Sequence, residues 1–218
     1  MSTRFERLST LTGVLAVALW VAGLVIAQGL SNPPSDSASD AQVLAWVQDK
    51  TTYILLGGWL FMIGCACFIW FVGTLRGRLA AAEGGTGSVS TIAFAGGVTA
   101  AVFAMGLPGG DFAAAVNKSD ISASTAGALH QAGTIFFAVT EISAIVMLAG
   151  VGAVALRTRV LPRWWAAVGL VLAIVLLVGP IGWLGVIFGL PAWTLVTALL
   201  ALRRTRAVDA PATAPAAA

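Results

Sequence analysis

Long apolar runs alternate with short polar segments along this chain, and that alternation predicts membrane-spanning helices. A helix that crosses the hydrocarbon core of a bilayer needs about 20 consecutive, mostly apolar residues. Runs of this kind, ended by arginines or by Gly/Pro clusters, cover residues 11–30, 53–75, 89–107 and 125–156. We therefore expect four full spans in this part of the chain. The fourth is longer than the bilayer and should tilt or project outward.

The last apolar stretch, Trp164 to Leu202, contains no charged residue. At about 1.5 Å per residue it is too long for a single span, and Gly179-Pro180-Ile181-Gly182 is the expected point of reversal. Two short spans follow, at residues 164–179 and 182–202, with Pro191 kinking the second. The sequence leaves open whether both halves cross the membrane completely.

Polar segments join these spans. Residues 40–48 predict a short amphipathic helix that lies on the outer surface of the membrane, with Ser39 or Asp40 as its N-cap. Residues 108–124 are expected to form a second outer loop. The Ala/Pro-rich tail, residues 207–218, has no apolar stripe and is predicted to be disordered.

The composition supports a membrane protein, because 59% of the 218 residues are hydrophobic and only 10% are charged. A soluble domain carries about a quarter of charged residues. With six spans every arginine falls on one side of the membrane, whereas only two lysines fall on the other. The positive-inside rule then makes both termini cytoplasmic.

The expected fold is an all-α, polytopic transmembrane bundle of six helices that forms a single domain over residues 1–206. Because the net charge of +3 is spread between apolar segments, it does not indicate nucleic-acid binding. The arginines that fall on the cytoplasmic side in this topology are Arg4, Arg7, Arg76, Arg78, Arg157, Arg159, Arg163, Arg203, Arg204 and Arg206.

Glu141 is the only acidic residue well inside a predicted span. An ionisable group in the hydrocarbon is costly, and this makes Glu141 a candidate functional residue. The sole histidine, His130, and Thr134 lie on the same helical face at i−11 and i−7. One interpretation is a proton or cation path from His130 inward to Glu141. The other is a neutral glutamic acid that donates a hydrogen bond to a neighbouring helix, while His130 is a solvated surface residue.

Other residues have a packing interpretation beside a functional one. Trp20 and Trp59 lie deep in their predicted spans, and their indole N–H groups could face Glu141 or an internal cavity. Cys65 and Cys67 are read as small packing residues. The outer aspartates could attract cations or simply form a solvated loop surface. They are Asp36, Asp40, Asp49, Asp111 and Asp120.

A stripe of small residues on the third span, Gly96, Ala100 and Ala104, allows close approach of another helix backbone. That helix could belong to this chain, to a second copy or to a partner membrane protein. We find no motif for catalysis, for a cofactor or for a metal ion.

The layout resembles a group of small, uncharacterised multi-pass membrane proteins of high-GC Gram-positive bacteria. The resemblance implies the same six-helix architecture and a location in the bacterial cytoplasmic membrane. It implies no activity, so no site residue is carried over. It rests on four segments: Arg4-Phe5-Glu6-Arg7-Leu8, Ala41 to Trp46, Trp70-Phe71-Val72-Gly73-Thr74-Leu75-Arg76 and Val160-Leu161-Pro162-Arg163-Trp164.

Three functional hypotheses follow from the sequence. The leading one is a non-enzymatic accessory, sensory or small-solute-handling component of the bacterial inner membrane. The second is a proton-coupled transporter or channel that uses Glu141 and His130. The third is an intramembrane enzyme that acts on a lipid or isoprenoid, with Glu141 as general acid.

Overall fold

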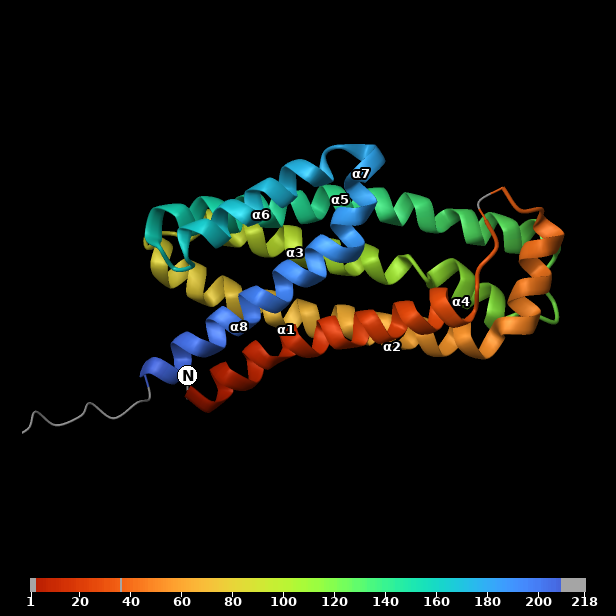
Figure 1. Ribbon diagram of the computed structural model, residues 1–218, viewed down its shortest axis with the longest axis horizontal. Coiled ribbons are helices and arrows are strands. Elements are labelled where there is room, and N and C mark those ends of the chain that lie inside the picture. Colours follow the sequence, from red (N-terminus) through yellow and green to blue (C-terminus); the bar gives the residue numbers. More distant parts are fainter. Residues whose placement is uncertain (1–2, 36, 209–218) are drawn as a thin grey trace, which may run out of the picture.

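The computed structural model describes residues 3–35 and 37–208, and within these ranges the chain is helical without any strand. This confirms the predicted all-α fold. Figure 1 shows the long helices lying side by side in one elongated bundle. The elements are α1 (Thr3–Leu24), the π-helical turn η1 (Val25–Leu30), α2 (Asp40–Glu83), α3 (Ser88–Gly106), α4 (Gly109–Val116), α5 (Ala123–Thr158), α6 (Arg163–Leu176), α7 (Gly179–Leu184), the π-helical turn η2 (Gly185–Gly189) and α8 (Leu190–Val208).

Five segments of the described chain are helical, long and apolar enough to cross a membrane: Arg7–Leu30, Asp40–Glu83, Ser88–Val116, Ala123–Thr158 and Ile181–Arg203. Helix α6 is apolar but has only 14 residues. At about 1.5 Å per residue it measures about 21 Å, less than the roughly 30 Å of hydrocarbon. Helix α6 is therefore the short first arm of a hairpin. The second arm of this hairpin consists of α7, η2 and α8.

The turn of this hairpin comes slightly earlier than predicted. Helix α6 ends at Leu176, and Val178 has the non-helical angles φ −95° and ψ 88°. The cause is Pro180, which has no N–H to continue the α6 hydrogen bonds and instead lies in the first turn of α7, where no such N–H is needed. Pro191 lies in the first turn of α8, directly after the π-helical turn η2. There the Leu190 N–H bonds back to the carbonyl of Gly185.

Helix α2 begins outside the predicted span. Ser39 and Gln42 form a capping box at its N-terminus, and the helix is kinked at Lys50, with φ −102° and ψ 16°. The predicted amphipathic segment is thus the first part of α2. Val43 and Val47 are buried, but against α4 and the start of α5 instead of against the membrane surface.

Helix α4 lies where an irregular outer loop was expected, and that prediction was wrong. The Pro108-Gly109-Gly110 sequence suggested a loop, yet Gly110 is needed for packing, because a side chain there would overlap the carbonyl oxygen of Leu129 on α5. Residues 40–50 of α2, helix α4 and residues 123–130 of α5 form a compact unit that we call the cap. It has a small hydrophobic core, which continues to Ile54 of α2 and otherwise consists of Val43, Val47, Ala114, Ala115 and Ala126.

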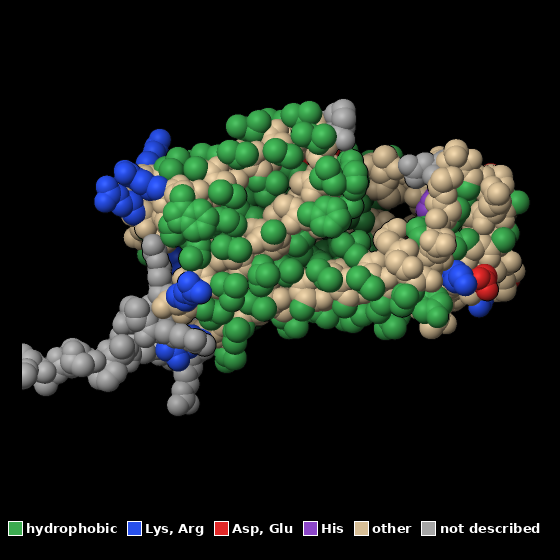
Figure 2. Space-filling view, in the orientation of Figure 1, with side chains coloured by type: hydrophobic (Ala, Val, Ile, Leu, Met, Phe, Trp, Pro, Cys, Tyr) green, Lys and Arg blue, Asp and Glu red, His purple; other side chains and the backbone are tan. Residues whose placement is uncertain are grey.

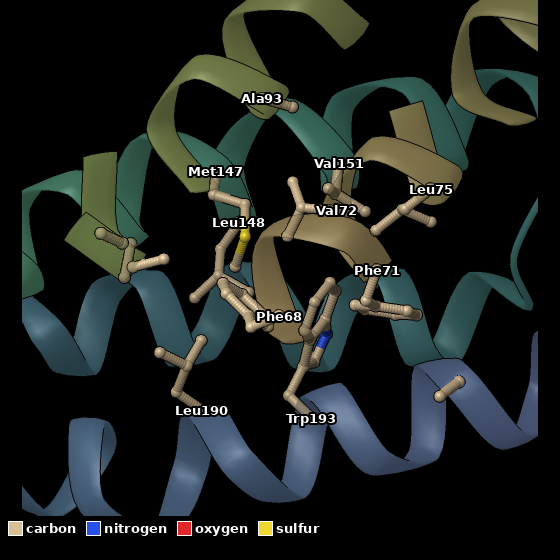
Figure 3. Packing of buried hydrophobic residues seen from close by; sticks show 14 of the residues in the cluster. Phe68, Phe71, Val72, Leu75, Ala93, Met147, Leu148, Val151, Leu190 and Trp193 are labelled. Atoms are coloured by element: carbon tan, nitrogen blue, oxygen red, sulfur yellow. The ribbon is translucent and has the colours of Figure 1, made fainter. Parts of the chain in front are cut away.

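The main core lies between α2, α3 and α5, with α1, α6 and α8 packed around it. Figure 3 shows Phe68 of α2 beside Leu148 of α5, with the ring of Trp193 of α8 between Phe68 and Phe71. The small-residue stripe Gly96, Ala100 and Ala104 is buried. Gly96 faces α5 within this chain, since a Cβ atom on it would lie 2.7 Å from the backbone nitrogen of Met147.

Positive charge is concentrated at the end of the bundle opposite the cap. The two ends of the described chain lie together there (Figure 1), and most of the blue Lys and Arg side chains on the face shown in Figure 2 gather at this end. Arg76, Arg78, Arg157, Arg163 and Arg203 lie at or near the helix ends that meet there. We call this the arginine end.

Candidate functional site

The strongest polar contact in the cap joins α4 to α5. Nδ1 of His130 lies 2.8 Å from Oδ1 of Asp111, and the two side chains are only 16% and 19% exposed. Asp111 is in the first turn of α4, and His130 is two turns into α5. One interpretation of the sequence made His130 a solvated surface residue and Asp111 part of a solvated loop. In the structure the two side chains are instead largely buried against each other.

Helix α2 completes the surroundings of this pair. The ring of Trp46 meets the His130 ring edge-on, with centroids 5.7 Å apart. The Trp46 indole N–H donates to the backbone carbonyl of Ser31, at 2.9 Å. Asp40 lies against Gly127, about one turn before His130, where a side chain on the glycine would overlap the carboxylate. Side chains of α2 and α4 therefore contact His130 of α5, and the segment before α2 holds Trp46 in place.

Glu141 lies at a different place on α5, beside the α6–α7 turn. Its side chain is half-buried, and its Oε1 atom is fully buried with no hydrogen-bond partner among the described residues. A Cβ atom added to Gly182 of α7 would overlap this oxygen. The same Cβ atom would lie 3.2 Å from the carbonyl oxygen of Leu176, the last residue of α6.

The predicted face of α5 is therefore divided. His130 belongs to the cap and Glu141 to the hairpin, and eleven residues of helix separate them by about 16 Å. Thr134, between them, is exposed. The three polar residues of the predicted face therefore have different surroundings. The proton or cation path between them stays a prediction.

The two tryptophans predicted as cavity neighbours of Glu141 have other partners. The Trp20 indole N–H donates to Sγ of Cys65 at 3.2 Å, and its ring packs against Phe61 and Phe68. Trp59 is 56% exposed and meets Phe112 of α4 edge-on, with centroids 5.7 Å apart. Trp20 thus ties α1 to α2, and Trp59 ties α2 to the cap.

Two hollows of the described chain lie away from Glu141. One, of about 120 Å³, lies at the arginine end between Glu83, Val89 and Arg157. The other is a shallow depression of about 440 Å³ in the cap, lined by Asn117, Asp120 and Thr125 among others. The described residues also contain no group of three His, Cys, Asp or Glu side chains that could hold a metal ion.

Asp111 and Trp46 are the residues that the sequence did not connect to the site. Asp111 follows Pro108-Gly109-Gly110, and the four residues together predict a turn. The usable signal was the run Ala113-Ala114-Ala115 after Asp111, since an acidic residue before a short apolar segment is typical of a helix N-terminus. Among the other outer aspartates, Asp36 lies outside the described residues.

Comparisons with protein-family models, with curated proteins and with solved structures give no match for this chain. The fold itself defines the class. With five long apolar helices in an all-helical bundle, this is a multi-pass membrane protein.

Proposed function

We propose that this protein is a non-enzymatic sensory component of the bacterial plasma membrane, whose cap responds to acidity on the outer side. The observation that carries the proposal is the contact between His130 and Asp111 at 2.8 Å. Histidine is the side chain whose charge most readily changes near neutral pH. A largely buried histidine that joins two helices therefore makes their packing dependent on pH.

The orientation follows from the arginines. The positive-inside rule puts the arginine end in the cytoplasm, and the cap then faces the outside of the cell. The resemblance to multi-pass proteins of high-GC Gram-positive bacteria supports the plasma membrane as the location. Acidification would reach the cap first.

A change in the cap has a direct route through the membrane. Helices α2 and α5, with 44 and 36 residues, each begin in the cap and end at the arginine end. In the cap, Val43 and Val47 of α2 share a hydrophobic core with Ala126 of α5. When the cap tightens or loosens, the relative position of these two helices changes along their length.

The direction of the response can be derived from the pair. Asp111 accepts a hydrogen bond from Nδ1 of a neutral or a charged imidazole, and the bond to the charged form is stronger. Acidification should therefore tighten the contact between α4 and α5. The gain is on the order of 1 kcal/mol, about fivefold in an opening equilibrium. The carboxylate of Asp40, which lies against Gly127 in the same cap, would favour the same charged form.

Hydrogen exchange measured by mass spectrometry, on the protein in lipid nanodiscs, tests this proposal. After correction for intrinsic exchange rates, peptides from residues 40–50 and 109–122 should exchange more slowly at mildly acidic than at neutral pH. His130→Gln should remove this difference, and Lys118→Gln, which changes an exposed charge of the same cap, should keep it. Equal protection of the wild-type cap at both pH values would contradict the proposal.

A further inference from the structure

The α6–α7 hairpin meets α5 at a point where two oxygen atoms lie close to one glycine. Oε1 of Glu141 occupies the space that a side chain on Gly182 would take. The carbonyl oxygen of Leu176 lies 3.2 Å from the same position. Both oxygens border the same position beside Gly182. An ionised carboxylate and a backbone carbonyl are both acceptors, so this arrangement is unfavourable unless a proton or a cation lies between them.

The Leu176 carbonyl is well placed to accept a hydrogen bond from outside its own helix. Its usual helical donor would be the N–H of the residue four positions later, and that residue is Pro180, which has none. Gly182 has no side chain to separate this carbonyl from α5. The break in the helix therefore leaves this acceptor without its helical donor, and it borders the same position beside Gly182 as Glu141 does.

The hairpin beside Glu141 offers no charged group to compensate an ionised carboxylate. Residues 164–202, which form nearly all of α6, α7, η2 and α8 up to that point, contain no charge, and α3 contains none. On α5 itself the nearest titratable or charged side chains are His130 and Arg157, eleven and sixteen residues away.

A metal ion fits this point poorly. Hard cations take six or more oxygen ligands, and here one carboxyl group and one carbonyl converge. The described residues offer no group of three metal-binding side chains. A proton needs only one donor oxygen and one acceptor.

We infer that Glu141 is a protonated carboxylic acid in the folded protein and that its O–H donates to the carbonyl oxygen of Leu176. This hydrogen bond holds the α6–α7 turn against α5. When the proton leaves to the outer water, two acceptors face each other and the contact between the hairpin and α5 weakens. The site is thus a proton-binding site that controls the position of the hairpin, independent of the histidine in the cap.

Thermal unfolding in nanodiscs at a series of pH values tests the inference. The stabilisation is present while the carboxyl group is protonated and is lost as the pH rises, so the wild-type melting temperature should fall toward alkaline pH. Glu141→Gln, which keeps an N–H donor and cannot ionise, should match the wild type at mildly acidic pH and lack this fall. Glu141→Ala should melt several degrees lower at acidic pH, and Thr134→Ala, an exposed polar change on the same helix, should behave like the wild type.

Infrared spectroscopy supplies a readout that does not depend on the alanine variant folding. The wild type should show the carbonyl-stretch band of a protonated carboxylic acid at neutral pH, and Glu141→Gln should lack it. Identical spectra in that region would overturn the inference. If sodium chloride but not choline chloride raises the melting temperature of the wild type, and neither salt raises that of Glu141→Gln, the inference is also overturned in favour of a bound cation.

Discussion

The carboxylate of Glu83, at the end of α2, accepts a hydrogen bond from the backbone N–H of Ser90, in the first turn of α3, at 2.8 Å. Its second oxygen accepts from the N–H of Val89 at 2.9 Å. The turn between the two helices uses Gly84, Gly85 and Gly87, all with positive φ. Glu83 therefore caps the next helix of the bundle and fixes the turn at the arginine end.

Glu83→Gln should lower stability at neutral pH and leave it unchanged in strong acid. The N–H groups of Ser90 and Val89 hold the pKa of Glu83 below its ordinary value of 4.5. For a carboxyl group with a lowered pKa in the folded state, the stabilisation is complete above the unfolded value. It is lost as the pH falls through the folded value. Melting temperatures of both proteins between neutral pH and pH values below 4.5 should therefore converge on acidification.

Asp120→Asn, at an exposed carboxylate in the cap, provides the control and should not alter this pH dependence. If the melting temperatures of Glu83→Gln and the wild type differ by the same amount at every pH, the effect comes from packing and not from the charge of Glu83.

The sequence predicts the long helices of this protein better than the short ones. The spans at 89–107 and 125–156 correspond closely to α3 and α5, because 20 or more apolar residues between polar breaks allow few alternatives. Helix α4 was missed because its eight residues begin with two glycines whose role is close packing, which only the tertiary structure reveals. The hairpin turn was placed correctly to within a few residues, since Pro180 is a local signal.

The candidate site was predictable only in part. Glu141 stands out in any sequence because it lies alone in an apolar run, but its neighbour Gly182 is 41 residues away and carries no side chain to suggest the contact. His130 and Asp111 were each visible as titratable residues. Their pairing depends on α4 being a helix, so the missed helix also hid the site.

Gly96→Ala should be strongly destabilising, whereas Gly77→Ala should not. A Cβ atom on Gly96 would lie 2.7 Å from the nitrogen of Met147 and 2.9 Å from the carbonyl oxygen of Ser143. These are backbone atoms of α5 and cannot move independently, so the helices must separate, at a cost of about 1–3 kcal/mol. Gly77 has nothing within 4 Å of such an atom, and alanine there should raise the stability of α2 by about 0.5–1 kcal/mol. Chemical or thermal unfolding of the two variants in the same detergent makes the comparison, and equal effects would argue against close packing of α3 on α5.

Cysteines introduced at Ser124 and Thr86 should react on opposite sides of the membrane. Both residues are exposed, the first in the cap and the second in the turn between α2 and α3 at the arginine end. If the positive-inside rule sets the orientation, a membrane-impermeant maleimide added to intact cells should label Ser124→Cys only. Thr86→Cys should become labelled after the cells are opened, and the wild type reports the background from Cys65 and Cys67. Labelling of Thr86→Cys in intact cells would reverse the proposed orientation and place the cap in the cytoplasm.

Cys65→Ala should cost more stability than the loss of one small side chain explains. Trp20 is 5% exposed, and its indole N–H donates to Sγ of Cys65 at 3.2 Å. Removing the sulfur leaves a buried donor without an acceptor, which typically costs about 1–3 kcal/mol. Cys67→Ala is the matched control, because Cys67 is only half-buried.

The decisive comparison is a double-mutant cycle with Trp20→Phe, which has no N–H to leave unpaired. In that background the cost of Cys65→Ala should shrink by about 1 kcal/mol, as expected for a lost hydrogen bond. Strictly additive effects in unfolding experiments would mean that α1 and α2 are held together here by ring packing against Phe61 and Phe68 alone.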